Sequence, residues 1–303
     1  MNDAVRWQDI AKGVTRVEAK TVLFVTGAVK SGTTWTQLWL DRHPQIACRG
    51  EGYFFNKFAG ALQALCREAS DMIEQQNQHK GEKLPEFPRM DLPIVQYLLR
   101  QSVLSCLSLY GGGDDIAVVG EKTPSTVLTL DTVFDLFPDA RVLNVVRDGR
   151  DVCISAWHDN LRKAPDAFKQ LYPTFGTFLP DIAQIWANHQ APALNAAERW
   201  PGQLRQIHYE DLLTTPHDTV AATFDWLGVD SGPDLVAACL GATDFRKLAD
   251  GRKPGEEDRD SFFRKGTAGQ WREVMTEEQQ RVFWEIAGAA MTAQGYSRES
   301  HPG

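Results

Sequence analysis

The 303-residue sequence lacks the features that mark metal-binding and membrane-spanning proteins. Its five cysteines are scattered, with no C-x-x-C pair and no Cys/His cluster at metal-ligand spacing, so we expect no bound metal. Their odd number fits a reducing compartment better than a disulfide framework. No stretch approaches the roughly 20 apolar residues that a membrane helix needs, so no membrane span is expected.

The sequence is also poor in positive charge. Its net charge of −8 argues against nucleic acid or an anionic membrane as a partner, because both select basic surfaces. An anionic ligand would therefore need a local basic site. Residues 1–20 are polar and amphipathic and lack the basic and apolar regions of a signal peptide, which predicts a cytoplasmic protein. The sequence gives no indication of an oligomeric state.

Short β-branched runs alternate with helical patterns along most of the chain. Strands are predicted at 21–26, 45–48, 116–120, 141–146 and 203–209. The main intervening helices are expected at 33–42, 129–137 and 181–200. This order predicts one α/β domain over residues 1–303, with a central, mostly parallel sheet flanked by helices.

Three segments interrupt the alternation. Residues 54–110 read as a helical insertion that is broken by a polar stretch at 75–83 and by prolines. Residues 161–180 read as an irregular flap, and both segments are expected near an acceptor site. Residues 250–272 suggest a C-terminal lid. The aromatic residues of the first two segments fit either an apolar acceptor pocket or the core: Tyr53, Phe54, Phe55, Phe58, Phe168, Tyr172, Phe175 and Phe178.

Charged residues follow several of the predicted strands. Lys30, Glu51, Lys122 and Arg147 each come after a different strand, and ligands of open α/β sheets bind beyond the carboxyl ends of the strands. In so acidic a chain, three cations at that edge predict a polyanionic ligand. Each residue also has an ordinary interpretation, since Lys122 and Glu51 could form a surface ion pair worth ~0–1 kcal/mol.

The loop after the first strand has the composition of an anion site. Gly27 and Gly32 have the G-x-x-x-x-G spacing of a nucleotide-triphosphate loop, and a helix N-terminus follows at Thr33. The triphosphate motif requires lysine directly after the second glycine, whereas the lysine here, Lys30, precedes it. The loop therefore predicts a phosphate or sulfate site of another kind, although a tight turn has the same local pattern.

Three separated motifs together resemble the sulfotransferases that use 3′-phosphoadenosine 5′-phosphosulfate (PAPS). Residues 29–35, V-K-S-G-T-T-W, are similar to that family's 5′-phosphosulfate loop, with Val29 where proline is usual. Residues 147–155 resemble its 3′-phosphate motif, in which Arg147 and Ser155 would bind the phosphate. Residues 264–272 are similar to its R-K-G-x-x-G-x-W signature, which closes over the same phosphate.

The resemblance implies a sulfotransferase that moves a sulfuryl group from PAPS to a hydroxyl of a small-molecule acceptor, with an amine as the weaker alternative and an apolar acceptor as one interpretation. Trp35 would stack on the adenine, and no metal is required. The implied donor-binding residues are Lys30, Ser31, Gly32, Thr33, Thr34, Trp35, Arg147, Ser155, Tyr209, Thr243, Phe245, Arg264, Lys265 and Gly266.

The general base is the point at which the chain departs from many cytosolic members of that family. Those members have K-T-H where this chain has Lys122-Thr123-Pro124, so their histidine is missing. Residues 51–55 resemble an element of the polysaccharide sulfotransferases in which a glutamate before an aromatic pair is the base. The implied catalytic residues are therefore Lys30, Glu51 and Lys122, with a histidine as the alternative base: His43, His158 or His208.

Two other functions compete with this interpretation. A P-loop kinase or nucleotide triphosphatase would depend on magnesium and ATP. A non-catalytic nucleotide-binding protein would keep the loop without turnover. The combination of Lys30, Glu51 and Lys122 favours an enzyme over the second alternative.

Overall fold

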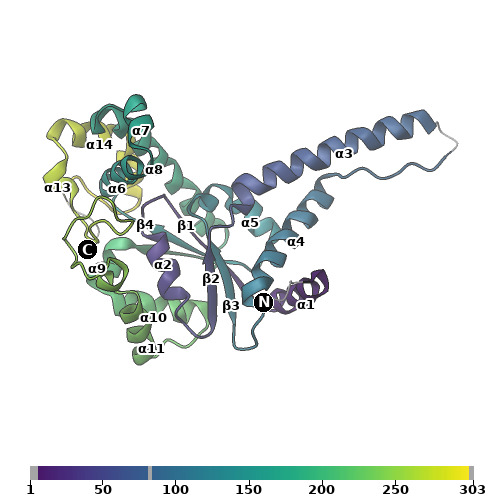
Figure 1. Cartoon of the computed structure of the whole chain (residues 1–303), viewed down its shortest axis with the longest axis horizontal. Coiled ribbons are helices and arrows are strands. Elements are labelled where there is room, and N and C mark those ends of the chain that lie inside the picture. The colour runs from purple at the N-terminus through teal and green to yellow at the C-terminus, as the bar shows by residue number, and fades with distance from the viewer. Residues whose placement is uncertain (1–5, 81–83, 300–303) are drawn as a thin grey trace.

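A five-stranded sheet forms the centre of the computed structural model, which describes residues 6–80 and 84–299. The strands are β1 (Thr21–Gly27), β2 (Ile46–Gly50), β3 (Val118–Lys122), β4 (Arg141–Val146) and β5 (Leu204–His208). They lie in the order β2-β3-β1-β4-β5, and each neighbouring pair is parallel. The predicted single α/β domain with a parallel sheet flanked by helices is confirmed (Figure 1).

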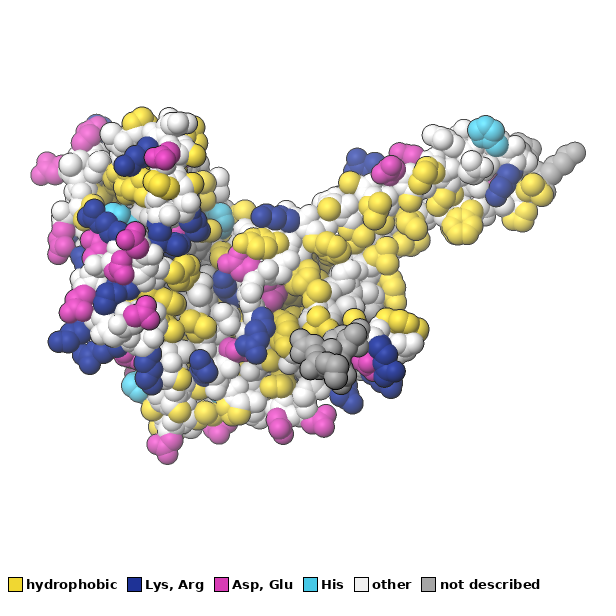
Figure 2. Space-filling model, viewed as in Figure 1, with side chains coloured by type: hydrophobic (Ala, Val, Ile, Leu, Met, Phe, Trp, Pro, Cys, Tyr) yellow, Lys and Arg dark blue, Asp and Glu magenta, His cyan; other side chains and the backbone are white. Residues whose placement is uncertain are grey.

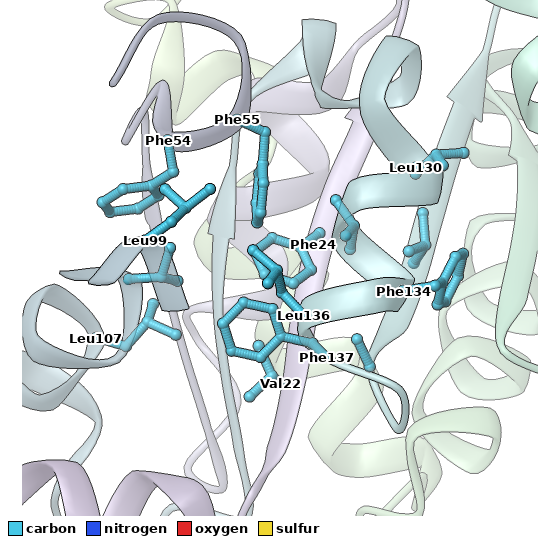
Figure 3. Packing of buried hydrophobic residues seen from close by; sticks show 14 of the residues in the cluster. Val22, Phe24, Phe54, Phe55, Leu99, Leu107, Leu130, Phe134, Leu136 and Phe137 are labelled. Atoms are coloured by element: carbon cyan, nitrogen blue, oxygen red, sulfur yellow. The ribbon is translucent and has the colours of Figure 1, made fainter. Parts of the chain in front are cut away.

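Both faces of the sheet are buried, because the side chains of a strand alternate between them. From β1, Val22 and Phe24 join an apolar cluster with α1 (Trp7–Glu18), α4 (Leu92–Gly111) and α5 (Leu130–Leu136). Figure 3 shows Phe24 beside Phe55 and Phe137 in this cluster. Leu23 and Val25 face the other side, which is covered by α2 (Thr33–Leu40), α10 (Pro216–Leu227) and α11 (Pro233–Ala242).

A third apolar cluster joins the helices at the end of the molecule opposite the projecting α3 (Figure 1). It includes α6 (Gly149–Lys163), α8 (Phe175–Arg199) and α14 (Glu277–Ala293). Trp186 and Phe283 are fully buried there, and the indole of Trp186 donates a hydrogen bond to the carbonyl of Arg147 at 3.1 Å. The cluster thereby fixes the backbone that follows β4.

The expected irregular flap at 161–180 is wrong. This segment contains the end of α6, the whole of α7 (Pro165–Leu171) and the start of α8. Pro165 occupies the first position of α7, where a missing N–H costs no helical hydrogen bond. Pro180 lies inside α8, but its neighbours Phe178 and Leu179 pack in the third cluster and stabilise the helix there.

The segment 54–110 forms an arm. It begins with a π-helical turn η1 (Phe54–Phe58), continues as α3 (Ala59–Lys80) and returns as α4, and α3 projects far from the body (Figure 1). The expected break at 75–83 is wrong for 75–80, which continue α3, and 81–83 lie outside the described residues. Hydrophobic side chains, among them Leu65 and Met72, are exposed along the arm (Figure 2).

The remaining elements lie around the carboxyl edge of the sheet. A 3₁₀ turn η2 (Pro124–Thr129) follows β3, α9 (Tyr209–Thr214) follows β5, and α12 (Phe245–Leu248) follows α11. Residues 249–270 form turns, bends and irregular backbone before α13 (Trp271–Val274). Within 6–80 and 84–299, no helix combines the length and the apolarity needed to cross a membrane.

Candidate active site

A cavity of about 800 Å³ lies where the loops after the strands meet the 262–267 segment. It brings together most of the residues predicted from the sequence: Lys30, Gly32, Thr33, Thr34, Trp35, Glu51, Arg147, Ser155, Tyr209, Thr243, Phe245, Arg264, Lys265 and Gly266. Ser31 is buried beside this lining, and Lys122 reaches it only through Glu51. Motifs more than 200 residues apart therefore share one cavity.

The glycine loop is shaped by close contacts with β4 and with Tyr209, the first residue of α9. Gly32 has a φ of 97°, and a Cβ at this position would lie 2.6 Å from the ring of Tyr209. A Cβ on Gly27 would lie 2.3 Å from the carbonyl oxygen of Val145. Glycine is required at both positions, and the loop then starts α2 with Thr33 and Thr34 on the cavity wall. A helix N-terminus at this place favours a bound anion.

Lys30 lies in the cavity wall, where its ammonium group contacts two residues that the sequence analysis did not assign to the site. Its Nζ is 3.3 Å from Oδ1 of Asp159 and 4.6 Å from the centre of the Phe262 ring. Burial lowers the pKa of Lys30, and Asp159 partly compensates. The ammonium group is therefore already neutralised by a carboxylate that an anionic ligand would have to compete with.

Asp159 accepts from three cations. Besides Lys30 it binds Arg162 at 2.9 Å and Lys163 at 2.7 Å. Burial would raise the pKa of Asp159, but these cations outweigh burial and lower the pKa to about 2. The sequence carried one signal for this residue, because Asp159 lies four positions after Ser155 and therefore on the same face of α6.

Arg147 links the glycine loop to the 264–272 motif across the cavity. Its guanidinium donates to the carbonyl of Lys30 at 3.1 Å and to that of Thr267 at 2.9 Å. The carboxylate of Asp151, one turn further on, accepts from the backbone N–H groups of Gly269 at 2.5 Å and Trp271 at 3.0 Å. The first turn of α6 therefore fixes the 264–272 motif over the glycine loop.

Several buried donors in this region have no partner among the described residues. These are the hydroxyl of Ser31 and the Nε groups of Arg147 and Arg264. Buried polar groups are almost always hydrogen-bonded, and guanidinium groups and hydroxyls match phosphate oxygens. Arg264 also donates to Glu257 and to Gln270, each at 2.5 Å. The site therefore fits a ligand with several anionic oxygens.

Aromatic side chains line the cavity beside these donors. The indole N–H of Trp35 donates to the carbonyl of Thr243 at 3.1 Å, and its ring meets Tyr209 edge-on at 6.0 Å. Phe245 packs against Gly266, where a Cβ would lie 2.4 Å from the ring. These contacts bring Trp35, Thr243 and Phe245 to one wall, as an adenine pocket would require.

The candidate base lies in the other half of the cavity. Nζ of Lys122 donates to Oε1 of Glu51 at 2.5 Å, and the hydroxyl of Tyr53 donates to Oε2. Burial would raise the pKa of Glu51, but the hydrogen bonds from Lys122 and Tyr53 outweigh it and lower the pKa. Glu51 is therefore an ionised carboxylate near neutral pH, and ionised carboxylates accept protons.

The three histidines considered as alternatives are differently placed. His43 is buried beside Phe224, with Nε2 2.8 Å from the carbonyl of Asp230. His208 lies at the end of β5, and its ring is 5.5 Å from that of Tyr296. His158 lines a small neighbouring cavity, and burial together with Arg264 lowers its pKa to about 4. None of the three is among the described residues that line the main cavity.

The aromatic residues of the two insertions divide between the pocket and the core. Phe54 and Phe55 belong to the core cluster (Figure 3), and Phe58 is exposed at 40%. Phe175 packs on Trp157 at 6.0 Å. The apolar residues that line the cavity include Tyr53, Phe168, Leu171, Tyr172, Phe178, Ile182 and Ile185.

This fold and site define a P-loop-like nucleotide-binding class of protein: a parallel sheet with a glycine loop after its central strand and arginines for a polyanion. A sequence model of the sulfotransferase family matches residues 23–233. The chain belongs to the sulfotransferase family. The family match favours the sulfotransferase interpretation over the P-loop kinase.

Individual relatives are distant. The chain is 25% identical over 209 residues to an uncharacterized protein of Aquifex aeolicus, covering 67% of this chain and only 25% of that protein. It is 24% identical over 217 residues to a putative protein-tyrosine sulfotransferase of Caenorhabditis briggsae, covering 71% of this chain and 68% of that protein. Among solved structures, mouse sulfotransferase SULT7A1 complexed with PAP is similar, with a TM-score of 0.53 and 16% identity over 95% of this chain and 91% of that chain.

Proposed function

We propose that this protein transfers a sulfuryl group from PAPS to a hydroxyl of an apolar small molecule, with an amine as the weaker acceptor. The observation that carries the proposal is the Glu51–Lys122 pair, which opens on the same cavity as Arg147, Ser155 and Arg264. One end of the cavity provides cations and unpaired donors for an anionic nucleotide. The other end provides a carboxylate next to apolar walls.

The donor half would bind the nucleotide through its anionic groups. The glycine loop and the start of α2 would hold the 5′-phosphate, and Arg147, Ser155 and Arg264 would hold the 3′-phosphate. The mouse protein that shares this fold was crystallised with PAP, which is PAPS without its sulfuryl group. The chemistry of the donor is that of an activated sulfate, and it needs no redox step.

The residues of the acceptor half would carry the proton and the charge. Oε2 of Glu51 would accept the proton of the acceptor hydroxyl while the new S–O bond forms and the bond to the 5′-phosphate breaks. Lys30 would stabilise the negative charge that develops on the leaving phosphate. Lys122 would keep Glu51 ionised, and its charge behind the carboxylate would help to stabilise the transferring sulfuryl group.

The acceptor class follows from the apolar residues that share the cavity with Glu51. They include Phe168 of α7, Phe178 and Ile182 of α8, and Tyr172 between the two helices. Such walls bury the apolar body of a ligand, while Glu51 fixes its hydroxyl. The relative from Caenorhabditis briggsae is named as a putative protein-tyrosine sulfotransferase, which makes a tyrosine phenol the second candidate.

The test is transfer of radiolabelled sulfate from PAPS to four probes: β-naphthol, n-octanol, n-octylamine and a tyrosine-containing peptide. We expect label in naphthol or octanol, with less in the amine. A second arm incubates the enzyme and labelled PAPS with a fractionated extract of the source cells. Label in the peptide alone would replace the apolar acceptor with tyrosine, and no transfer to any probe or extract fraction would overturn the proposal.

A further inference from the structure

Three consecutive residues at the end of β3 hold three consecutive residues after β2. The backbone ladder between these strands ends with the pair Gly50 and Lys122. Beyond it, side chains take over the pairing. Lys122 binds the side chain of Glu51, and its neighbours Glu121 and Thr123 bind the next part of the same loop.

The two further contacts are made to backbone groups. Oε2 of Glu121 accepts the N–H of Gly52 at 3.1 Å, and Oγ1 of Thr123 accepts the N–H of Tyr53 at 3.3 Å. The hydroxyl of Thr123 also donates to Oε2 of Glu121 at 2.7 Å, which links the two acceptors. Gly52 and Tyr53 directly follow the candidate base, so these bonds fix the main chain from which Glu51 projects.

The environment of Glu121 is costly for a carboxyl group. Its side chain lies on the same side of the sheet as Phe24, above the core cluster that contains Phe54 and Phe55, and the residue is only 2% exposed. Burial raises the pKa of Glu121, and Oε1 has no partner among the described residues. A buried carboxyl group with one unpaired oxygen is unfavourable, so the hydrogen bonds that it accepts from Gly52 of the loop and from Thr123 offset only part of that cost.

We infer that Glu121 and Thr123 are positioning residues for Glu51, an inference that rests on the proposed function. Lys122 alone would fix one oxygen of the base and leave its backbone free to rotate. With Gly52 and Tyr53 held by Glu121 and Thr123, the loop has one arrangement, and Oε2 of Glu51 stays on the cavity side. A displacement of about 1 Å at a reacting group can cost ~100-fold in rate, so such anchoring matters for turnover.

The primary variant is Thr123→Val, which keeps the shape of the side chain and removes the acceptor for the N–H of Tyr53. With β-naphthol and PAPS, we expect kcat to fall by roughly 10- to 100-fold while the Kd of PAP stays within about twofold. The acid limb of the pH profile of kcat should move to higher pH, because a looser loop weakens the bonds that lower the pKa of Glu51. Thr123→Ser restores the hydroxyl and should recover both parameters.

A second pair of variants tests Glu121 directly. Glu121→Leu removes both acceptor oxygens and should resemble Thr123→Val. Glu121→Gln keeps one acceptor oxygen for Gly52 and Thr123 and should recover most of the turnover lost in Glu121→Leu. If Glu121→Leu does not fold, Thr123→Val and Thr123→Ser decide the question on their own.

The outcomes separate this inference from the proposed function. Parental kcat in Thr123→Val, or a loss of kcat with an unmoved acid limb or a matching loss of PAP affinity, would overturn the positioning role. Glu51→Gln is measured in parallel. If Glu51→Gln retains parental turnover, the proposed base is wrong; if it is inactive while Thr123→Val is normal, only the positioning role fails.

Discussion

Lys122 and Glu51 form an ion pair at 2.5 Å across the ends of two adjacent strands, β3 and β2. The side chain of Lys122 is 6% exposed and that of Glu51 is 27% exposed, so the lysine lies behind the carboxylate as seen from the cavity. This arrangement keeps one oxygen of Glu51 on the lysine and leaves the other for Tyr53 or a ligand. The predictions about catalysis depend on these different roles of the two carboxylate oxygens of Glu51.

Glu51→Gln removes the candidate base and keeps its size. We expect kcat for naphthol sulfation to fall by about 10²–10⁴-fold, the usual contribution of general base catalysis. Donor binding should be retained, because Glu51 is in the acceptor half of the cavity. Isothermal titration with PAP and steady-state kinetics check both statements. Glu68→Gln, on the exposed face of α3, is the matched control and should behave as the parent.

Tyr53→Phe should change the pH dependence of turnover. Hydrogen bonds from Lys122 and Tyr53 lower the pKa of Glu51, so the parental acid limb of kcat/KM should lie below the ordinary glutamate value of about 4.3. Without the Tyr53 hydroxyl the pKa of Glu51 rises, and the acid limb moves to higher pH. The acceptor KM should also fall, because Tyr53 no longer competes for Oε2. Tyr97→Phe, exposed on the arm, serves as the control, and an unmoved limb in Tyr53→Phe would contradict the assignment.

Arg147→Ala should abolish donor binding. The substitution removes a buried guanidinium and both of its bonds to the carbonyls of Lys30 and Thr267, so we expect the Kd of PAP to rise at least ~100-fold. Titration of the parent protein with PAP in the presence of EDTA also tests the kinase alternative. A kinase requires magnesium, whereas we expect PAP to bind the parent protein without it. Arg141→Ala, at the other end of the same strand, should leave PAP affinity unchanged. PAP binding that persists in Arg147→Ala would contradict the predicted phosphate site.

Asp159→Asn should strengthen the binding of the anionic donor. The substitution removes the carboxylate that neutralises Lys30, Arg162 and Lys163, and the potential at the donor site becomes more positive. We expect the Kd of PAP to fall by roughly three- to tenfold at low salt, with a smaller effect at high salt. Asp166→Asn, exposed on α7, controls for the change of net charge. Equal or weaker binding in Asp159→Asn would show that the carboxylate does not oppose the ligand.

Much of the fold was readable from local patterns. The apolar runs of β1, β3 and β4 and the motifs that follow them predicted a parallel sheet with charged groups at one edge, and the structure has both. The flap at 161–180 was misread because its content of proline, lysine and phenylalanine was taken as that of an irregular segment. Phe168, Tyr172, Phe175 and Phe178 are spaced by three or four residues, which is a helical pattern that Pro165 and Pro180 hid.

The parts of the site that sequence reasoning missed depend on contacts between distant segments. The pairing of Glu121 and Thr123 with the loop after Glu51 follows from the register of β2 and β3, which no local pattern determines. The hydrogen bond of Tyr53 to Glu51 depends on the turn that η1 imposes after β2. Asp159 was the exception, because its helical spacing from Ser155 was visible in the sequence.

The strand order also sets the dimensions of the chemistry. Glu51, Lys122, the glycine loop, Arg147 and Tyr209 lie at the carboxyl ends of β2, β3, β1, β4 and β5, which is the spatial order of the sheet. Neighbouring strands of a sheet lie about 4.8 Å apart. Three inter-strand spacings, about 14 Å, therefore separate the strand end that carries Glu51 from the strand end that carries Arg147. A nucleotide bound along this edge would lie across the strands. The length of the nucleotide, rather than the identity of its nucleobase, would determine which of its chemical groups reaches Glu51.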